Sequence, residues 1–232
     1  MATQGTFGGR RGWTIAQRLR APDSYGLLSI LVIASIIVTV WSDTTVGNVL
    51  TVLFQGVALL FALVTSRARA ATIRAAIALV LLSVIGAAVG SAVASSTGLV
   101  ISSGVRAALT ISALVAIAHR LGTHPVVSGE TLLGAICVYL LIGLLFAAVD
   151  GMVEGIQGTA FFVQVTRTTW MDRLYFSYVT LATVGFGDLT PATDAGRVSA
   201  ITEALTGQLY LVSVVAVVVG NLGRLRNRDD RT

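Results

Sequence analysis

Long apolar runs alternate with short polar segments along most of the chain. Six runs have about the 17–25 residues that an α-helix needs to cross the hydrocarbon core of a bilayer. In order they are Tyr25–Trp41, Val46–Thr65, Ile73–Val93, Leu99–Ala118, Thr131–Val149 and Val198–Leu222. The pattern predicts an all-α integral membrane protein with six transmembrane helices.

A shorter helical pattern, Trp170–Ala182, lies between the fifth and sixth runs. Thr169 and Asp172 have the spacing of a capping box at its start. Its 13 residues would extend about 20 Å, which is too short to cross a bilayer. We therefore expect a re-entrant helix enclosed by protein, whose negative C-terminal end favours a cation near the membrane centre.

Composition narrows the classes of function. Hydrophobic residues make up 55% of the chain and charged residues 12%, with a mean hydropathy of +0.85, far from the composition of a soluble domain. The net charge of +5 comes from arginine, because the chain has no lysine. These arginines gather at the ends of apolar runs, which does not suggest a nucleic-acid partner. We find no motif for nucleotide binding, metal binding or catalysis, and expect neither an enzyme nor a cofactor.

Arginine placement predicts the orientation in the membrane, because cytoplasmic loops carry an excess of positive charge. If six helices alternate, one side receives both chain ends and the arginines Arg67, Arg69, Arg74 and Arg120. This side is predicted to be cytoplasmic, in a plasma-membrane protein with both termini inside the cell.

The loop after the short helix, residues 183–188, reads TVGFGD. A dehydrated cation needs a cage of oxygens, and backbone carbonyls supply one only if successive carbonyls face the same way. Some residues must then adopt left-handed conformations, which glycine reaches at little steric cost. The alternation of Gly185 and Gly187 with Val184 and Phe186 meets this requirement.

TVGFGD resembles the selectivity filter of potassium channels, whose usual form is TVGYGD. The resemblance is strong for about residues 130–222 and only architectural for 26–120. It implies potassium-selective conduction by a homotetramer in a lipid bilayer, with oxygens lining a shared axis. The implied filter residues are Thr183, Val184, Gly185, Phe186 and Gly187, with potassium bound at the first four and Asp188 at the outer mouth. Phe186 lacks the usual tyrosine hydroxyl, which can tether the filter.

The resemblance also implies roles around the filter. Gly207, eleven residues after Gly196, matches the hinge glycine of the inner helix, although a small residue that only permits packing explains it equally well. Glu203 is expected to brace the filter region or contact a neighbouring helix, and Gln208 to face a water-filled cavity. An aromatic cuff around the filter is expected from Trp170, Tyr175, Phe176 and Tyr178.

The first four runs do not have the charge pattern of a voltage sensor, because the fourth contains only Arg106. We interpret them as a scaffold. Arg106 could pair with an acidic group, contact lipid headgroups or bind a ligand. A Gly86–Gly90 G-x-x-x-G match in the third run either permits close helix packing or occurs by chance.

The predicted organisation has five parts. A cytoplasmic tail (1–24) precedes a four-helix bundle (25–120), a linker (121–130), a pore domain (131–222) with a turret at 151–168, and a short tail (223–232). The predicted function is passive potassium conduction without strong voltage gating. A potassium transporter with filter-like loops would need four pore units, and the chain has one. A weakly selective cation channel and a non-conducting regulatory subunit remain the alternatives.

Overall fold

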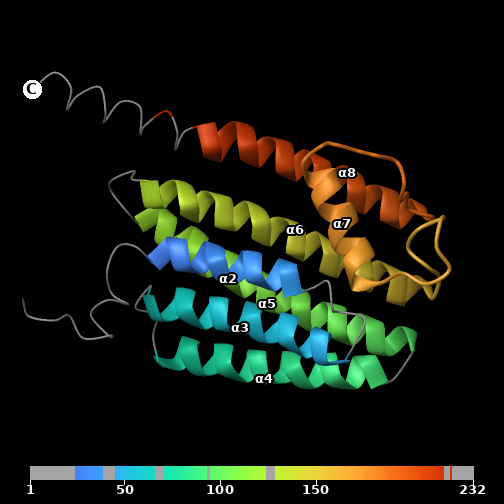
Figure 1. Cartoon of the computed structure of the whole chain (residues 1–232), viewed down its shortest axis with the longest axis horizontal. Helices are drawn as coiled ribbons and strands as arrows, with labels where there is room; N and C mark the ends of the chain where they lie inside the picture. Colours follow the sequence, from blue (N-terminus) through green and yellow to red (C-terminus); the bar gives the residue numbers. More distant parts are fainter. Residues whose placement is uncertain are drawn as a thin grey trace, which may run out of the picture.

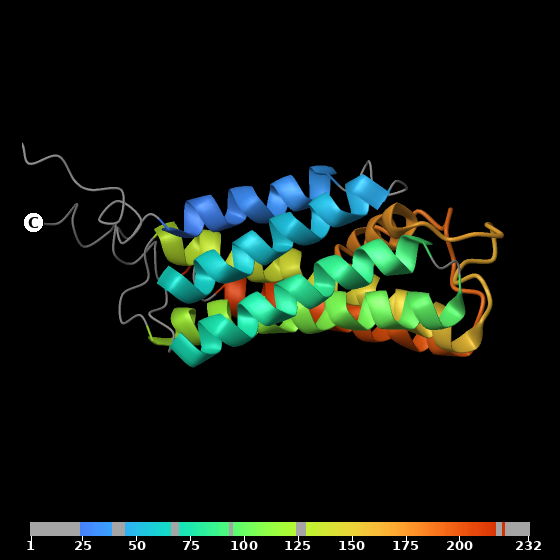
Figure 2. The same ribbon diagram turned by 90° about the horizontal axis from the view of Figure 1, so that it is seen from below.

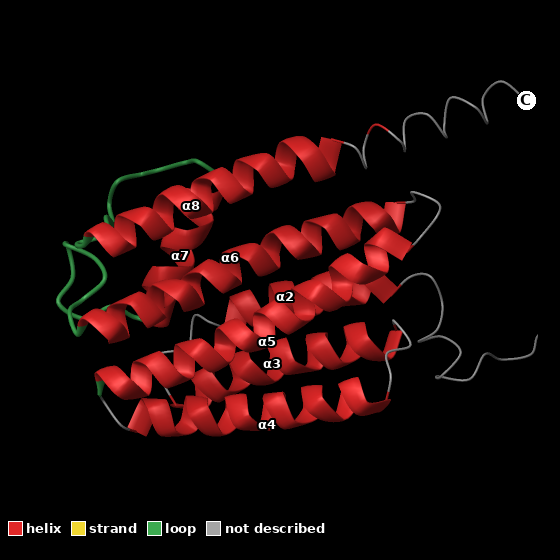
Figure 3. Ribbon diagram, turned by 180° about the vertical axis from the view of Figure 1, so that it is seen from behind, coloured by secondary structure: helices red, strands yellow, loops and turns green. Residues whose placement is uncertain are grey.

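The computed structural model describes residues 24–38, 45–65, 70–92, 95–123, 129–216 and 220. Among them the chain is helical, with one isolated bridge between Phe162 and Pro191 and no strand (Figure 3). The helices are α2 (Ser24–Val38), α3 (Thr45–Thr65), α4 (Ala70–Ala92), α5 (Ser96–Thr123), α6 (Gly129–Gln157), α7 (Trp170–Leu181), α8 (Asp194–Tyr210) and the π-helical turn η2 (Leu211–Val215). The all-α prediction is confirmed. The two predicted tails, apart from Ser24, and the middle of the predicted linker lie outside the described residues.

Helix α6 lies between two groups of helices (Figure 1). On one side α2 and α5 contact it, and α3 and α4 complete a four-helix bundle with them. On the other side α7 and α8 contact it and each other. Figure 2 shows the same arrangement from below, with the bundle helices running side by side. One apolar core extends from Leu28 in α2 to Leu181 at the end of α7, so the bundle packs as one body with the unit of α6, α7 and α8, which corresponds to the predicted pore domain and is called the pore unit below.

Three described helical segments are long and apolar enough to cross a membrane: Ala70–Ala88, Ser96–His119 and Thr131–Gln157. Gly26–Val38 and Val49–Val64 are shorter apolar helices. The segments that adjoin α2 and follow η2 include residues outside the described ranges, so the count of six spans stays a prediction.

Helix α6 extends eight residues beyond the predicted end at Val149, to Gln157, so the first part of the expected turret is helical. Gly151 and Gly155 in this extension face α5. A Cβ at Gly155 would lie 2.9 Å from the carbonyl oxygen of Ser96, and one at Gly151 would overlap Ser103. This glycine pair lets α5 and α6 approach closely. At Gly86, by contrast, a Cβ would meet nothing within 4 Å.

The short helix α7 has the predicted start. The Thr169 side chain accepts a hydrogen bond from the backbone N of Asp172 at 3.1 Å, and the Asp172 carboxylate accepts one from the backbone N of Thr169 at 2.9 Å. This confirms the capping box. With 12 residues, α7 extends only about 18 Å. It lies obliquely between α6 and α8, and its C-terminal end leads into the TVGFGD loop (Figure 1).

Candidate functional site

Along the TVGFGD loop, residues with a positive φ angle alternate with residues without one. Gly185 and Gly187 have φ angles of 58° and 76°, as the spacing of the glycines predicted. Thr183 also has a positive φ, 55°, the only non-glycine residue described with one. A β-branched residue rarely adopts this conformation, so the surrounding structure must hold it. Every second residue from 183 to 187 is therefore left-handed.

The start of the loop is fixed to the C-terminal end of α7. The backbone N–H groups of Thr183 and Val184 donate to the carbonyls of Thr180 and Val179, both at 2.9 Å. The Tyr139 hydroxyl of α6 donates to the Leu181 carbonyl at 3.1 Å. Carbonyls that a helix end leaves without partners are thus used to hold the loop.

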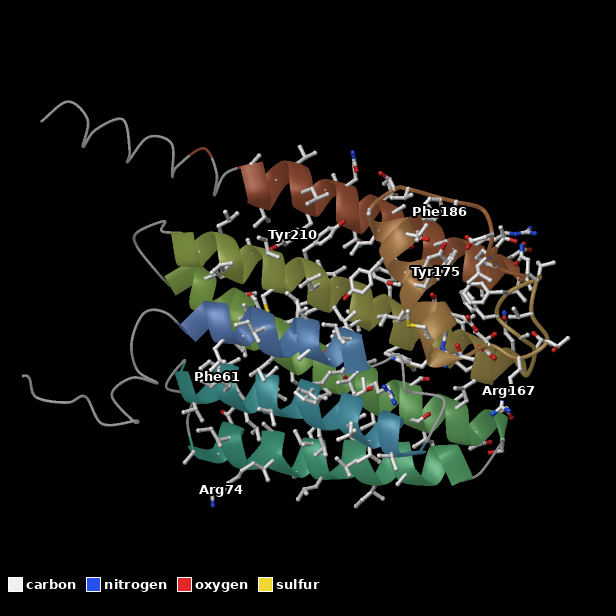
Figure 4. All side chains as sticks on the ribbon, viewed as in Figure 1. Phe61, Arg74, Arg167, Tyr175, Phe186 and Tyr210 are labelled. Carbon is white, nitrogen blue, oxygen red and sulfur yellow. The ribbon has the colours of Figure 1, made fainter. Side chains whose placement is uncertain are left out.

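The end of the loop is held by Tyr175 of α7. Its hydroxyl donates to the Asp188 carboxylate at 2.7 Å, and its ring stacks on Phe186 with centroids 6.5 Å apart and planes 7° apart (Figure 4). The hydrogen bond to Asp188 raises the pKa of the Tyr175 hydroxyl, because the carboxylate stabilises the protonated phenol. The face of the Phe186 ring is therefore in contact with Tyr175 of the same chain.

The other three aromatic residues expected around the loop, Trp170, Phe176 and Tyr178, have contacts of their own in the single chain. Phe176 packs against Phe161 and Phe162, with centroids 6.0 and 5.0 Å away. The Tyr178 hydroxyl donates to the Leu140 carbonyl at 2.8 Å. Trp170 lies at the opposite end of α7 from the loop. Tyr175 and Phe176 both line a recess of about 200 Å³ behind the loop, which supports the cuff for these two rings, and for Trp170 and Tyr178 the cuff stays a prediction.

Residues just outside the loop tie it to the turret. The backbone N of Val163 donates to the Thr190 carbonyl at 3.0 Å, and that of Ala192 to the Phe161 carbonyl at 2.8 Å. The Gln164 side chain bonds both the hydroxyl and the backbone N of Thr190. The residues that follow TVGFGD are thereby fixed to residues 161–164.

Behind α7, buried polar side chains join three helices. Glu203 of α8 is fully buried, and its carboxyl group is hydrogen-bonded to the Ser177 hydroxyl of α7, whose oxygen also lies 2.7 Å from the Gly143 carbonyl oxygen of α6. Asp150 of α6, also fully buried, accepts from Ser199 of α8 at 2.6 Å. Glu203 therefore contacts a neighbouring helix, one of the two positions expected for it.

A buried ion pair lies near the N-terminal end of α7. Nη1 of Arg173 is 2.8 Å from Oε2 of Glu154 in α6, with exposed side-chain fractions of 5% and 12%. The sequence analysis missed Ser177, Arg173 and the two acidic residues of α6 as site residues. The available signal was the presence of ionisable residues within or beside apolar runs, which usually have structural or functional partners.

Gly207 lies where α8 crosses the end of α7. It is buried, and a Cβ there would overlap the Leu181 carbonyl and lie 2.8 Å from Cδ1 of Leu181. This close approach supports the packing interpretation of Gly207 over that of a hinge. Four residues later α8 gives way to the π-helical turn η2. Gln208 is exposed on the single chain.

One face of the pore unit is uncovered in the single chain. All six residues of TVGFGD are exposed, with Val184 at 53% and Phe186 at 69%. Helix α8 exposes Ile201, Leu205 and Leu209 at 59–65%. An apolar face of this extent marks a surface that contacts protein or lipid.

Comparisons with known proteins point to the same region. Residues 137–223 match a family model described as an ion channel. The chain is 30% identical over 98 residues to the potassium voltage-gated channel subfamily A member 4 of Homo sapiens. It is 28% identical over 88 residues to an A-type voltage-gated potassium channel of Rattus norvegicus. The matches cover 42% and 38% of this chain but only 14% and 13% of those relatives. Residues 137–223, from within α6 onward, are thus similar to ion channels.

Proposed function

We propose that this chain forms a passive, potassium-selective channel from four copies in a cell membrane. The observation that carries the proposal is the left-handed backbone at Thr183, Gly185 and Gly187, which alternates with Val184 and Phe186. Such alternation turns successive carbonyls toward one side of the loop, where they can replace the hydration shell of an ion. Similarity of residues 137–223 to ion channels supports the proposal.

Potassium ions would bind the backbone oxygens of Thr183, Val184, Gly185 and Phe186, with the Thr183 hydroxyl at the inner end. Gly187 completes the filter, and Asp188 would attract cations at the outer mouth. The hydrogen bond from Tyr175 to Asp188 holds this carboxylate beside the loop and leaves it exposed. Gln208 would face the cavity on the inner side of the filter.

A single loop cannot enclose an ion, so several copies must share an axis. The exposure of TVGFGD together with the apolar side chains of α8 supports assembly through this face. The proposed channel is a homotetramer with six spans per chain and both termini in the cytoplasm. In Figure 4, Arg74 and Arg167 lie at opposite ends of the molecule, and Arg74 would lie at the cytoplasmic end.

Strong voltage gating is not part of the proposal. One arginine in the fourth apolar run supplies too little charge, since each elementary charge gains only about 2.3 kcal/mol per 100 mV when fully translocated. A conductance that rises steeply with voltage would contradict this part of the proposal.

The test is ion flux through purified protein in liposomes, with potassium and sodium gradients compared. Gly185→Ala should abolish potassium flux, because a Cβ disfavours the φ of 58° on which the filter depends. Gly158→Ala is a matched control: Gly158 has a φ of 67°, and a Cβ there would meet nothing within 4 Å, but it lies in the turret. The control should keep its flux.

Other outcomes separate the alternatives. Equal potassium and sodium flux would indicate a weakly selective cation channel. Protein that forms tetramers but passes no ion under changes of voltage, pH or lipid would indicate a non-conducting subunit. Flux that survives Gly185→Ala would contradict the assignment of the filter.

A further inference from the structure

Arg106 is the one arginine within the apolar run of α5, and it is 94% buried, since its exposed fraction is 6%. Its guanidinium carbon Cζ lies 4.5 Å from the centroid of the Trp170 ring. A guanidinium at this distance over an indole forms a cation–π contact. Trp170 is the first residue of α7, so this contact joins the bundle directly to the pore helix.

A second guanidinium approaches the same indole. Cζ of Arg173 lies 6.0 Å from the Trp170 centroid, and Nη1 of Arg173 bonds Glu154 of α6. Asp150, one turn before Glu154, bonds Ser199 of α8. Two buried cations thus lie near two acidic side chains. The Arg106–Trp170 contact joins α5 to α7, and the Arg173–Glu154 ion pair joins α7 to α6. One turn earlier in α6, the Asp150–Ser199 hydrogen bond joins α6 to α8.

The indole itself depends on these neighbours for its orientation. In the described part of the chain, Nε1 of Trp170 has no hydrogen-bond partner, although the residue is only 6% exposed. Packing and the two guanidiniums therefore hold the ring. The C-terminal end of α7 has separate supports, through Tyr139 and Ser177. Fixing a rod-like helix requires contacts at both ends.

We propose that Arg106 is a positioning residue for the filter, which fixes the N-terminal end of α7 to the four-helix bundle by stacking on Trp170. The inference rests on the proposed function for its effect on conduction, but the contact itself does not. It assigns Arg106 a role in filter geometry and gives the bundle a direct route to the pore. Of the three options that the sequence left open, none included a contact with an aromatic ring.

The test combines two readouts on the full chain in liposomes. The first is hydrogen exchange of the backbone amides in α7, compared with those of α6 and α8. The second is potassium flux and its ratio to sodium flux. The variants are Arg106→Met, which keeps the stem and removes the charge, Arg106→Lys, and Trp170→Phe, with Arg74→Met as a control on an exposed arginine of α4.

Arg106→Met should accelerate exchange in α7 about two- to thirtyfold, the range that a buried cation–π contact allows. Exchange in α6 and α8 should stay unchanged, and the potassium-to-sodium flux ratio should fall. For Arg106→Lys and for Trp170→Phe, both the exchange rate in α7 and the flux ratio should lie between the values for Arg106→Met and those for the original chain. The reason is that each variant retains part of the cation–π pair. Arg106→Met combined with Trp170→Phe should change α7 exchange by less than the sum of the two single effects, because both variants act on the same cation–π contact. Arg74→Met should change neither readout.

Three results would overturn the proposal. Unchanged exchange in α7 would show that the contact does not hold the helix. Equal acceleration in α6, α7 and α8 would show a merely structural role. Faster exchange in α7 with an unchanged flux ratio would show that α7 can move without affecting the filter. If the original chain conducts no ion, the proposed function fails, and the exchange readout still tests the contact.

Discussion

The four-helix bundle and the pore unit are both helical and share one core, but polar side chains are used differently in them. In the bundle, most hydroxyls bond within their own helix, as from Ser83 to the Leu79 carbonyl and from Thr110 to the Arg106 carbonyl. Ser29 of α2, by contrast, donates to the Leu133 carbonyl of α6. Among α6, α7 and α8 several cross between helices, as from Tyr139 to Leu181 and from Ser199 to Asp150. The Thr202 and Thr206 hydroxyls bond within α8. Apolar packing is non-directional, whereas hydrogen bonds fix both distance and angle. Hydrogen bonds therefore fix the geometry between helices more often among α6, α7 and α8 than within the bundle.

The largest expected effect comes from replacing a glycine in each part, Gly207 in α8 and Gly86 in α4. Gly207→Ala should destabilise the protein by about 2–3 kcal/mol and abolish flux, because its Cβ would overlap the Leu181 carbonyl that Tyr139 also bonds. Gly86→Ala in the bundle should stabilise by up to about 1 kcal/mol through helix propensity. Unfolding in detergent and liposome flux measure both. A Gly207→Ala protein of normal stability with altered opening would instead favour the hinge.

A second test compares two buried polar side chains. Glu203→Leu should destabilise by about 2–3 kcal/mol, because it leaves Ser177 without one of its partners and places apolar atoms in a site shaped for a carboxyl group. Gln55 of α3 is 6% exposed, and its amide atoms have no hydrogen-bond partner among the described residues. Gln55→Leu should therefore stabilise by about 1 kcal/mol. If both changes shift the free energy of unfolding in the same direction, the contrast fails.

A smaller effect is expected when single hydroxyls are removed. Tyr139→Phe leaves the Leu181 carbonyl at the end of α7 without its side-chain donor and should cost about 1 kcal/mol, with faster amide exchange at Thr183 and Val184. Ser83→Ala removes a bond within one helix and should change stability by less than about 0.5 kcal/mol. Equal effects from the two changes would show that hydrogen bonds between helices have no special weight here.

The elements that the sequence predicted best were those with a local physical signal. Runs of apolar residues located the described helices to within a few residues at most ends, and the capping-box spacing located the start of α7 at Trp170. The glycine spacing predicted the left-handed backbone at 185 and 187. These signals reside in consecutive residues and need no knowledge of packing.

The features that the sequence could not supply depend on partners. The end of the fifth apolar run at Val149 placed Glu154 in the turret, but Ser199 and Arg173 allow Asp150 to lie buried and Glu154 half-buried in α6. The sequence could not show which aromatic rings lie beside the TVGFGD loop, because spacing does not give the rotation of α7. Tyr175 faces the loop, and Tyr178, one turn later, faces α6. The positive φ of Thr183 likewise depends on the bonds that anchor the loop to α7.

In the proposed channel, the position of α6 determines how the bilayer can act on the TVGFGD loop. From residue 140 to 151 every α6 side chain is buried or half-buried, because the bundle covers one side and α7 and α8 the other. Acyl chains therefore have little access to the middle of this wall, while α4 exposes Ile77, Leu81 and Ile85 on the far side of the bundle. A change in membrane thickness or lateral pressure would act first on the bundle, and α5 would transmit it to α7. In the proposed channel, the bundle would therefore carry a mechanical signal from the lipid toward the TVGFGD loop.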